Sequence, residues 1–178
     1  MKKNTSVSLS DFIGSIYTLK ALTRYNNKFK IINESVAEHS YFVAVLTLKL
    51  HDDYKFNLEK ALKMALVHDI PELHLSDVTH DVKRNFPKLA DEVTKAEYVI
   101  MRDKYPNWYS EFKTFEDQDS VEAKIVKMAD NLSCVQYATA EMDLGNKGYM
   151  KEVAQNAAER VIQCEKNLKK WRRKNAKK

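Results

Sequence analysis

Only three glycines and three prolines occur in this chain of 178 residues. Turns between β-strands depend on these residue types, because glycine reaches positive φ and proline fixes φ near −65°. A β-sandwich or barrel would therefore need many more of them. The glycines, Gly14, Gly145 and Gly148, are also too few and too far apart to form a P-loop or a dinucleotide-binding motif. The scarcity predicts a helical protein and excludes a phosphate-binding glycine loop.

Apolar residues recur at three- and four-residue spacing along most of the chain, which is typical of one face of an α-helix. Helices are expected over residues 9–22, 39–50, 58–69, 88–104, 120–144 and 149–171. Ser35 and Glu38 form a capping-box pattern before the second of these helices. Residues 28–33, 72–83 and 107–116 lack a clear period and are expected to be loops or irregular. The prediction is a single all-α domain over residues 1–178, with about six to eight helices.

Residues with metal-binding chemistry lie at the ends or edges of three expected helices. His68 and Asp69 end one helix, just before Pro71, which stops it. Adjacent helical residues point about 100° apart, so both can reach one ion only where the helix ends. His39 lies early in the capped helix, and Asp130 lies beside an apolar stripe, where an unpaired carboxylate is costly. Taken singly, these residues also fit a polar helix end, a structural histidine and a salt bridge.

The same residues belong to a longer series of short motifs in a fixed order. The motifs are Thr23-Arg24-Tyr25, Glu34-Ser35-Val36-Ala37-Glu38-His39-Ser40, Val67-His68-Asp69-Ile70-Pro71-Glu72, Asp77-Val78-Thr79-His80-Asp81-Val82-Lys83 and Lys127-Met128-Ala129-Asp130. The order H, HD and D on three helices resembles the HD-domain metal-dependent phosphohydrolases. The whole set resembles their bacterial 5′-deoxynucleotidase (YfbR-like) branch over roughly residues 9–142, which implies an HD-domain helical bundle.

In that family, two histidines and two aspartates bind one divalent ion and leave positions for water and a phosphate oxygen. The resemblance assigns these roles to His39, His68, Asp69 and Asp130. Two neutral imidazoles and two carboxylates balance the charge of a divalent ion, and the donor set suits Mn, Fe, Co, Ni or Zn, with Mg as a further candidate. Such an ion polarises a phosphoryl oxygen and lowers the pKa of bound water, which is what hydrolysis of a phosphate ester needs.

The resemblance also implies roles for five further residues. Glu72 is the catalytic carboxylate, acting as general base or orienting the water, and Asp77 lies near the water and favours a 2′-deoxyribose. Arg24 binds the substrate phosphate, whose geometry a guanidinium matches. Tyr25 is expected to stack on the sugar or base, and Lys83 to contact phosphate. Tyr25 replaces a common Trp, and residues 79–81 replace a common Pro-Thr-Pro, so substrate details are expected to differ.

The expected activity is hydrolysis of deoxynucleoside 5′-monophosphates to deoxynucleoside and orthophosphate. Two alternatives remain open at this stage. One is a dATPase-like enzyme that releases tripolyphosphate from a deoxynucleoside triphosphate, since the residues for metal, water and phosphate are nearly the same. The other is a non-catalytic HD protein that binds nucleotide, which the presence of Glu72 argues against. The family resemblance further implies a homodimer.

Other histidines and aspartates are expected to play no part in the metal site. His51-Asp52 repeats the HD dipeptide, but no glutamate follows it at the spacing of Glu72, so it is interpreted as a solvated helix end. His74, His80 and Asp81 could form a second metal site, but no ligand spacing among them requires one, so they are interpreted as simple loop residues, some of them near the substrate.

The formal charge of +5 and the pI near 9 suggest a nucleic-acid partner at first. The last fourteen residues, 165–178, hold eight basic residues and one acid, whereas the rest of the chain is slightly acidic. The expected organisation is therefore a catalytic core over about 9–162 and a solvated basic tail over about 165–178. A nucleic-acid partner is not expected.

The sequence contains no apolar run of the length that a membrane span needs. Its basic N-terminus, Met1-Lys2-Lys3, is not followed by the apolar stretch of a signal peptide. The two cysteines, Cys134 and Cys164, cannot form a disulfide framework. The expected location is therefore the cytoplasm, with no membrane partner.

Overall fold

The computed structural model describes residues 7–175, and this range is helical apart from its loops and one isolated β-bridge between Thr23 and Ser35. The helices are α1 (Leu9–Thr18), α2 (Val36–Asp53), α3 (Leu58–Val67), α4 (Glu72–Leu75), α5 (His80–Asn85), α6 (Pro87–Lys104), the 3₁₀-helix η1 (Pro106–Trp108), α7 (Tyr109–Asp117), α8 (Val121–Asp143) and α9 (Tyr149–Asn175). The predicted all-α class is confirmed. No described helix is long and apolar enough to cross a membrane. The basic Met1-Lys2-Lys3 segment and Lys177 and Lys178 lie outside the described residues.

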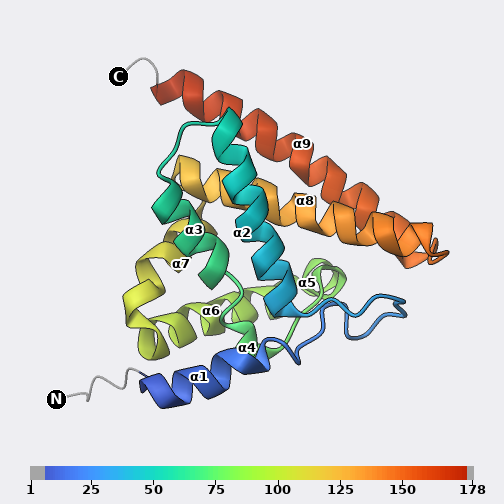
Figure 1. Cartoon of the computed structure of the whole chain (residues 1–178), viewed down its shortest axis with the longest axis horizontal. Helices are drawn as coiled ribbons and strands as arrows, with labels where there is room; N and C mark the ends of the chain where they lie inside the picture. The colour runs from blue at the N-terminus through green and yellow to red at the C-terminus, as the bar shows by residue number, and fades with distance from the viewer. Residues whose placement is uncertain (1–6, 176–178) are drawn as a thin grey trace.

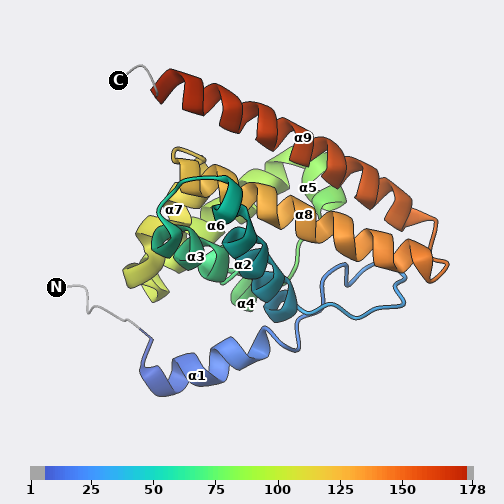
Figure 2. The ribbon, with the colours of Figure 1, turned by 45° about the horizontal axis from the view of Figure 1, so that its top comes forward.

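The longest helices, α8 and α9, form an antiparallel pair that extends across the molecule (Figure 1). Gly145 allows the reversal between them, because its φ of +104° lies in a region that other residues rarely adopt. Helices α2, α3 and α7 pack on the other side of α8, and α1 lies at the edge of the bundle far from α9 (Figure 2). In this arrangement α8 is the central helix and contacts both layers.

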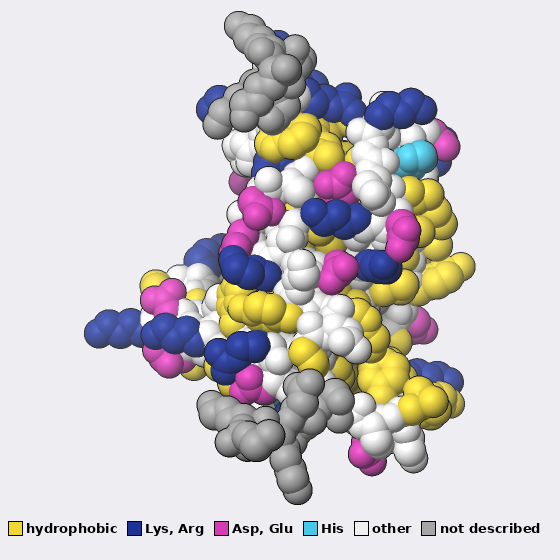
Figure 3. All heavy atoms as spheres, turned by 90° about the vertical axis from the view of Figure 1, so that its left-hand side faces the viewer, with side chains coloured by type: hydrophobic (Ala, Val, Ile, Leu, Met, Phe, Trp, Pro, Cys, Tyr) yellow, Lys and Arg dark blue, Asp and Glu magenta, His cyan; other side chains and the backbone are white. Residues whose placement is uncertain are grey.

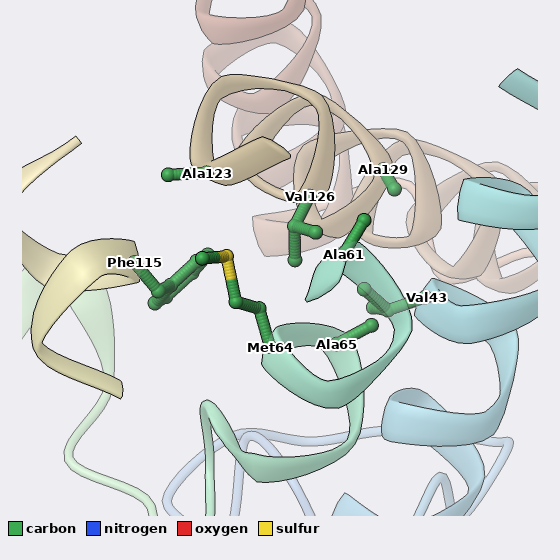
Figure 4. Packing of buried hydrophobic residues seen from close by; sticks show 8 residues of the cluster. All are labelled: Val43, Ala61, Met64, Ala65, Phe115, Ala123, Val126 and Ala129. Atoms are coloured by element: carbon green, nitrogen blue, oxygen red, sulfur yellow. The ribbon is translucent and has the colours of Figure 1, made fainter. Parts of the chain in front are cut away.

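A compact apolar cluster joins α2, α3, α7 and α8 (Figure 4). Its buried members are Val43, Ala61, Met64, Ala65, Phe115, Ala123, Val126 and Ala129. Four alanines let the helices approach closely, and the Met64 side chain reaches toward Phe115 in the gap between them. His39, His68 and Asp130 each lie within four residues of a cluster member. The rigid core therefore sets the relative positions of the expected metal ligands.

Two helix boundaries agree closely with the sequence patterns. The Ser35 hydroxyl accepts from the Glu38 backbone N–H at 3.2 Å, and the Glu38 carboxylate accepts from the Ser35 N–H at 2.8 Å. This confirms the predicted capping box at the start of α2. Helix α3 ends at Val67, two residues before the predicted end at Asp69, so His68 and Asp69 lie in the turn that precedes Pro71.

Two segments expected to be irregular contain helices. Residues 72–83 include the short helices α4 and α5, joined by the loop 76–79. The prediction for residues 107–116 was wrong, because α7 begins at Tyr109. Phe112 and Phe115 lie three residues apart on this helix and are both buried, so tertiary packing outweighs the modest helix propensity of the aromatic residues.

Helix α9 continues through most of the segment that was expected to be a solvated basic tail. Leu168 is buried and packs with Ile125 and Met128 of α8, so the apolar core extends beyond residue 162. The guanidinium of Arg172 lies 4.6 Å from the centre of the Tyr54 ring, in a cation–π contact. Lys and Arg side chains gather around this end of the molecule (Figure 3).

Candidate metal centre and active site

The four expected ligands come together where α2, α8 and the end of α3 meet. One ligand atom each of His39, His68 and Asp130 lies within 4.8 Å of the other two. His39 Nε2 is 3.2 Å from Asp130 Oδ1 and 3.7 Å from Asp69 Oδ2. His68 Nε2 is 3.2 Å from the same Asp69 oxygen. Because α3 has ended before His68, adjacent residues 68 and 69 both reach this point, as the sequence argument required.

The imidazole group of His68 is oriented as a ligand of a cation. His68 Nδ1 donates to the Ala65 carbonyl at 2.9 Å, which leaves the lone pair on Nε2 directed into the cluster. The Nε2 atoms of both His39 and His68 are buried and have no hydrogen-bond partner among the described residues. A buried polar atom without a partner is costly. The unpartnered nitrogens and two adjacent carboxylates therefore fit a divalent ion.

The surroundings also hold these groups in the charge states that metal binding needs. Burial opposes ionisation of Asp130, but the charges of Lys127 and His39 outweigh it. They bring the pKa of this carboxyl well below its ordinary value, and Lys127 Nζ lies 2.9 Å from Asp130 Oδ2. Burial likewise opposes ionisation of Asp69, but the charge of His68 and its hydrogen bond outweigh burial and lower the pKa of Asp69. Burial and the charge of Arg24 lower the pKa of His39, which keeps its ring neutral.

We expect metal affinity to fall as the pH is lowered. An ion can bind only when both imidazoles are unprotonated, and Asp69 outweighs burial to raise the pKa of His68 above its ordinary value. Titration of the ion-free protein should show at least a roughly tenfold weaker apparent affinity at about pH 5.5 than at about pH 7.5.

The decoy histidine supplies the control for this titration. His51→Gln should retain both the affinity and its pH dependence, because the His51 ring packs edge-on against Phe56 away from the cluster. His68→Gln should bind the ion weakly at every pH. An affinity independent of pH in the unmodified protein would rule out imidazole ligands.

Glu72 and Asp77 flank the cluster from the α4–α5 segment. Glu72 begins α4, and its Oε2 atom is buried without a hydrogen-bond partner. Burial, followed by the charges of Asp69 and Asp77, raises the pKa of Glu72 well above its ordinary value. Asp77 Oδ2 accepts from the Tyr25 backbone N–H at 2.6 Å, and burial raises the pKa of Asp77. Glu72 is thus a stronger base than an ordinary glutamate.

Arg24 holds its guanidinium beside the cluster. Nη1 lies 2.8 Å from Glu34 Oε2 and 2.9 Å from His39 Nδ1, and Nη2 lies 3.4 Å from Cys134 Sγ. The side chain is only 13% exposed. A cation fixed next to a metal site is well placed to bind an oxygen of a phosphate.

A cavity of about 380 Å³ opens onto the cluster. Its wall includes the expected site residues Arg24, Tyr25, Asp69, Glu72, Asp77, Lys83 and Asp130. The wall also contains His80, one of the loop residues of which some were expected near the substrate, and three residues that the sequence did not assign to the site, Lys127, Asn131 and Arg160. Lys127 could have been assigned to the site from the sequence, because it lies three residues before Asp130 on the same expected helix. No pattern in the sequence around Arg160 points to the site, because only the packing of α9 on α8 brings this residue to the cavity wall.

Two of the expected substrate contacts have protein partners in the structure. The Tyr25 ring stacks on Tyr137 with centroids 5.3 Å apart, lies beneath the Arg24 guanidinium and is only 8% exposed. Tyr25 also has a φ of +53°, and its N–H bond to Asp77 holds the loop in this conformation. Lys83 Nζ lies 3.3 Å from Glu97 Oε1.

The remaining histidines and aspartates form no second metal cluster within residues 7–175. Asp52 is 64% exposed on its side chain and pairs with Lys49, which agrees with a solvated helix end. His74 lies 3.2 Å from the Tyr105 hydroxyl. Asp81 binds Lys28 at 2.7 Å.

The fold and the histidine–aspartate cluster together define an HD-domain phosphohydrolase. The chain superposes on the HD phosphohydrolase DatZ of cyanophage S-2L with a TM-score of 0.60, over 88% of this chain and 96% of that one. That protein is described as bound to dA and one catalytic Zn²⁺ ion. At 18% identity, this likeness concerns the fold alone.

Residues 11–171 match the model of the family described as 5′-deoxynucleotidase YfbR-like, and the chain belongs to this family. It is 29% identical to human 5′-deoxynucleotidase HDDC2 over 150 residues, which cover 79% of this chain and 71% of that protein. A Pyrococcus horikoshii protein of known crystal structure superposes with a TM-score of 0.75 at 30% identity, over 89% of this chain and 95% of that one. The family expected from the motifs is confirmed.

Proposed function

We propose that this protein is a metal-dependent phosphohydrolase that converts deoxynucleoside 5′-monophosphates to deoxynucleoside and orthophosphate. The observation that carries the proposal is the pair of buried, unpartnered imidazole nitrogens next to Asp69 and Asp130 at a cavity that also contains Glu72 and Arg24. Membership of the YfbR-like family and the name of the human relative support the substrate class.

In the proposed mechanism, His39, His68, Asp69 and Asp130 hold one divalent ion. When bound, the ion supplies positive charge that polarises a phosphoryl oxygen and lowers the pKa of a water molecule. Glu72 orients the attacking water and accepts its proton, for which its raised pKa is suited. Arg24 binds a phosphate oxygen and offsets the negative charge that accumulates on the phosphoryl group.

Asp77 has two roles in this proposal. Its bond to the Tyr25 N–H holds the loop that positions Arg24, because residues 24 and 25 are adjacent. Its place in the cavity wall suits a contact with the sugar, and the family resemblance associates this position with preference for a 2′-deoxyribose. Lys83 is proposed as a weaker phosphate contact.

One assay tests the proposal. The protein is loaded separately with Co, Mn, Zn, Fe, Ni or Mg and incubated with deoxynucleoside monophosphates, ribonucleoside monophosphates and deoxynucleoside triphosphates, with and without chelator. Orthophosphate released from the deoxynucleoside monophosphates, and lost with chelator, supports the proposal. Tripolyphosphate from a triphosphate would support the dATPase-like alternative. Tight nucleotide binding without turnover on any ion would indicate a non-catalytic protein.

We also propose that the protein acts as a homodimer in the cytoplasm. Helix α2 exposes the large apolar side chains of Tyr41, Phe42, Val45 and Leu48. Beside it, an apolar groove of about 480 Å³ is lined by residues of α2 and α8. Exposed apolar patches of this kind favour association. Sedimentation of the unmodified protein should give twice the monomer mass, and Phe42→Glu should reduce it.

A further inference from the structure

The active-site cavity has a basic region of which the proposed hydrolysis uses only Lys83, as a weaker phosphate contact. Helices α5, α8 and α9 contribute it, and we call it the α5–α9 wall, formed by His80, Lys83, Lys127, Asn131 and Arg160. Three of its five side chains are cations. The negative charge of a nucleoside monophosphate lies entirely on the phosphate that Arg24 and the ion are proposed to bind. Arg160, which has no part in the proposed hydrolysis, therefore needs a separate explanation.

Arg160 is held in a defined orientation by two uncharged partners. Its Nε donates to Asn131 Oδ1 at 2.7 Å, and its Nη1 lies 3.2 Å from His80 Nε2. Asn131 is itself fixed, because its amide donates to the Lys127 carbonyl at 2.7 Å and the residue is buried. Nη2 makes no hydrogen bond to another described residue. The guanidinium is thus preorganised and keeps N–H donors free at the cavity.

Arg160 differs from the other cations of the wall in its charge partners. Lys83 pairs with Glu97 at 3.3 Å, and Lys127 pairs with Asp130 at 2.9 Å. Within the part of the chain that the structure describes, no carboxylate lies within 4.0 Å of an Arg160 nitrogen. Partial desolvation and the charges of Arg160 and Arg84 lower the pKa of His80, which favours the uncharged form of this ring.

We propose that Arg160, oriented by Asn131 and His80, forms an oxyanion subsite that binds the β-phosphate of a deoxynucleotide. The inference rests on the proposed function, which places the first phosphate at Arg24 and the ion. A guanidinium with free N–H donors and no carboxylate partner matches the geometry and charge of a phosphate. The sugar and the base are uncharged and would offer the Arg160 guanidinium only uncharged acceptors.

The test compares binding of dAMP and dADP by calorimetry in the Glu72→Gln background, which suppresses turnover, at constant free metal ion. The parent should bind dADP at least about tenfold more tightly than dAMP, which is the range of one charge-assisted hydrogen bond. Arg160→Gln should abolish this preference and leave the affinity for dAMP within about twofold. Arg160→Lys should restore part of the preference.

Arg84→Gln is the matched control. Arg84 also carries a guanidinium close to His80, but it pairs with Glu152 at 3.2 Å and does not line the main cavity, so this variant should keep the preference for dADP. Equal affinities for dAMP and dADP in the parent would overturn the subsite. An equal loss of affinity for dAMP and dADP in Arg160→Gln would also overturn the subsite, because it would show that Arg160 contacts the part that the two ligands share.

The subsite and the proposed function fail in different ways. Hydrolysis of dAMP by the unmodified protein without a preference for dADP would reject the subsite and keep the function. An Arg160-dependent preference for dADP in a protein that hydrolyses no nucleotide on any ion would keep the subsite and reject the function.

Discussion

Asp69→Ala is expected to lower kcat/KM for a deoxynucleoside monophosphate by about 10³-fold or more and to release the ion. A bound ion contributes several kcal/mol to stabilisation of the transition state, and each 1.36 kcal/mol corresponds to about a tenfold change in rate. Asp69 is close to both histidines, with 3.2 Å to His68 Nε2 and 3.7 Å to His39 Nε2. Its loss removes a charged ligand at the centre of the cluster. Steady-state kinetics and metal analysis of the purified protein measure the two effects.

The decoy HD dipeptide provides the matched control for this variant. Asp52→Ala makes the same side-chain change next to His51, but Asp52 is exposed and forms a surface ion pair with Lys49. Its activity and metal content should stay within about twofold of the unmodified protein, as surface ion pairs are weak. Thermal unfolding should show that Asp69→Ala remains folded. Full activity in folded Asp69→Ala would refute the assignment of the metal site.

Glu72→Gln is expected to lower kcat by about 10²- to 10⁴-fold, the usual range for loss of a general base, with KM within about twofold. Glutamine keeps the size and polarity of the side chain but cannot accept a proton. Metal content should be unchanged, because Glu72 lies outside the set of four proposed ligands. This combination of lost turnover and retained ion separates a catalytic carboxylate from a metal ligand.

Glu116→Gln is the comparison for this second variant. Glu116 is an exposed residue of α7, and partial desolvation raises the pKa of its carboxyl as well, against the lowering effect of Lys127. Glu116 does not line the active-site cavity. Its variant should therefore keep kcat within about twofold. If Glu72→Gln were as active as Glu116→Gln, the base would have to be another group.

The sequence motifs anticipated most of the site because they combine local structure with chemistry. The capping box sets the start of α2 and so places His39 in its first turn. Pro71 ends α3 early enough for His68 and Asp69 to meet at one point. Both effects act over a few residues, so their patterns are visible without knowledge of the fold. The ligand roles themselves stay a prediction until the variants are measured.

The stacking partner of Tyr25 could not be predicted from the residues around it. An aromatic side chain after Arg24 suggested stacking on the substrate, and the motif contained no information about other partners. In the fold, Tyr137 of α8 stacks on this ring although it lies more than one hundred residues away. The contact depends on how α8 approaches the loop, which no short motif encodes.

The sequence by itself determined the helical class, the order of the proposed ligands and the family. Sparse glycine and proline, apolar periodicity and short motifs are sufficient for these, because each acts along the chain. Only the tertiary structure decided that α7 is helical, that α9 packs as far as Leu168 and that Arg160 reaches the cavity. These features depend on burial between helices and on contacts between distant residues. The α5–α9 wall is therefore a property of the folded protein, although each of its residues is visible in the sequence.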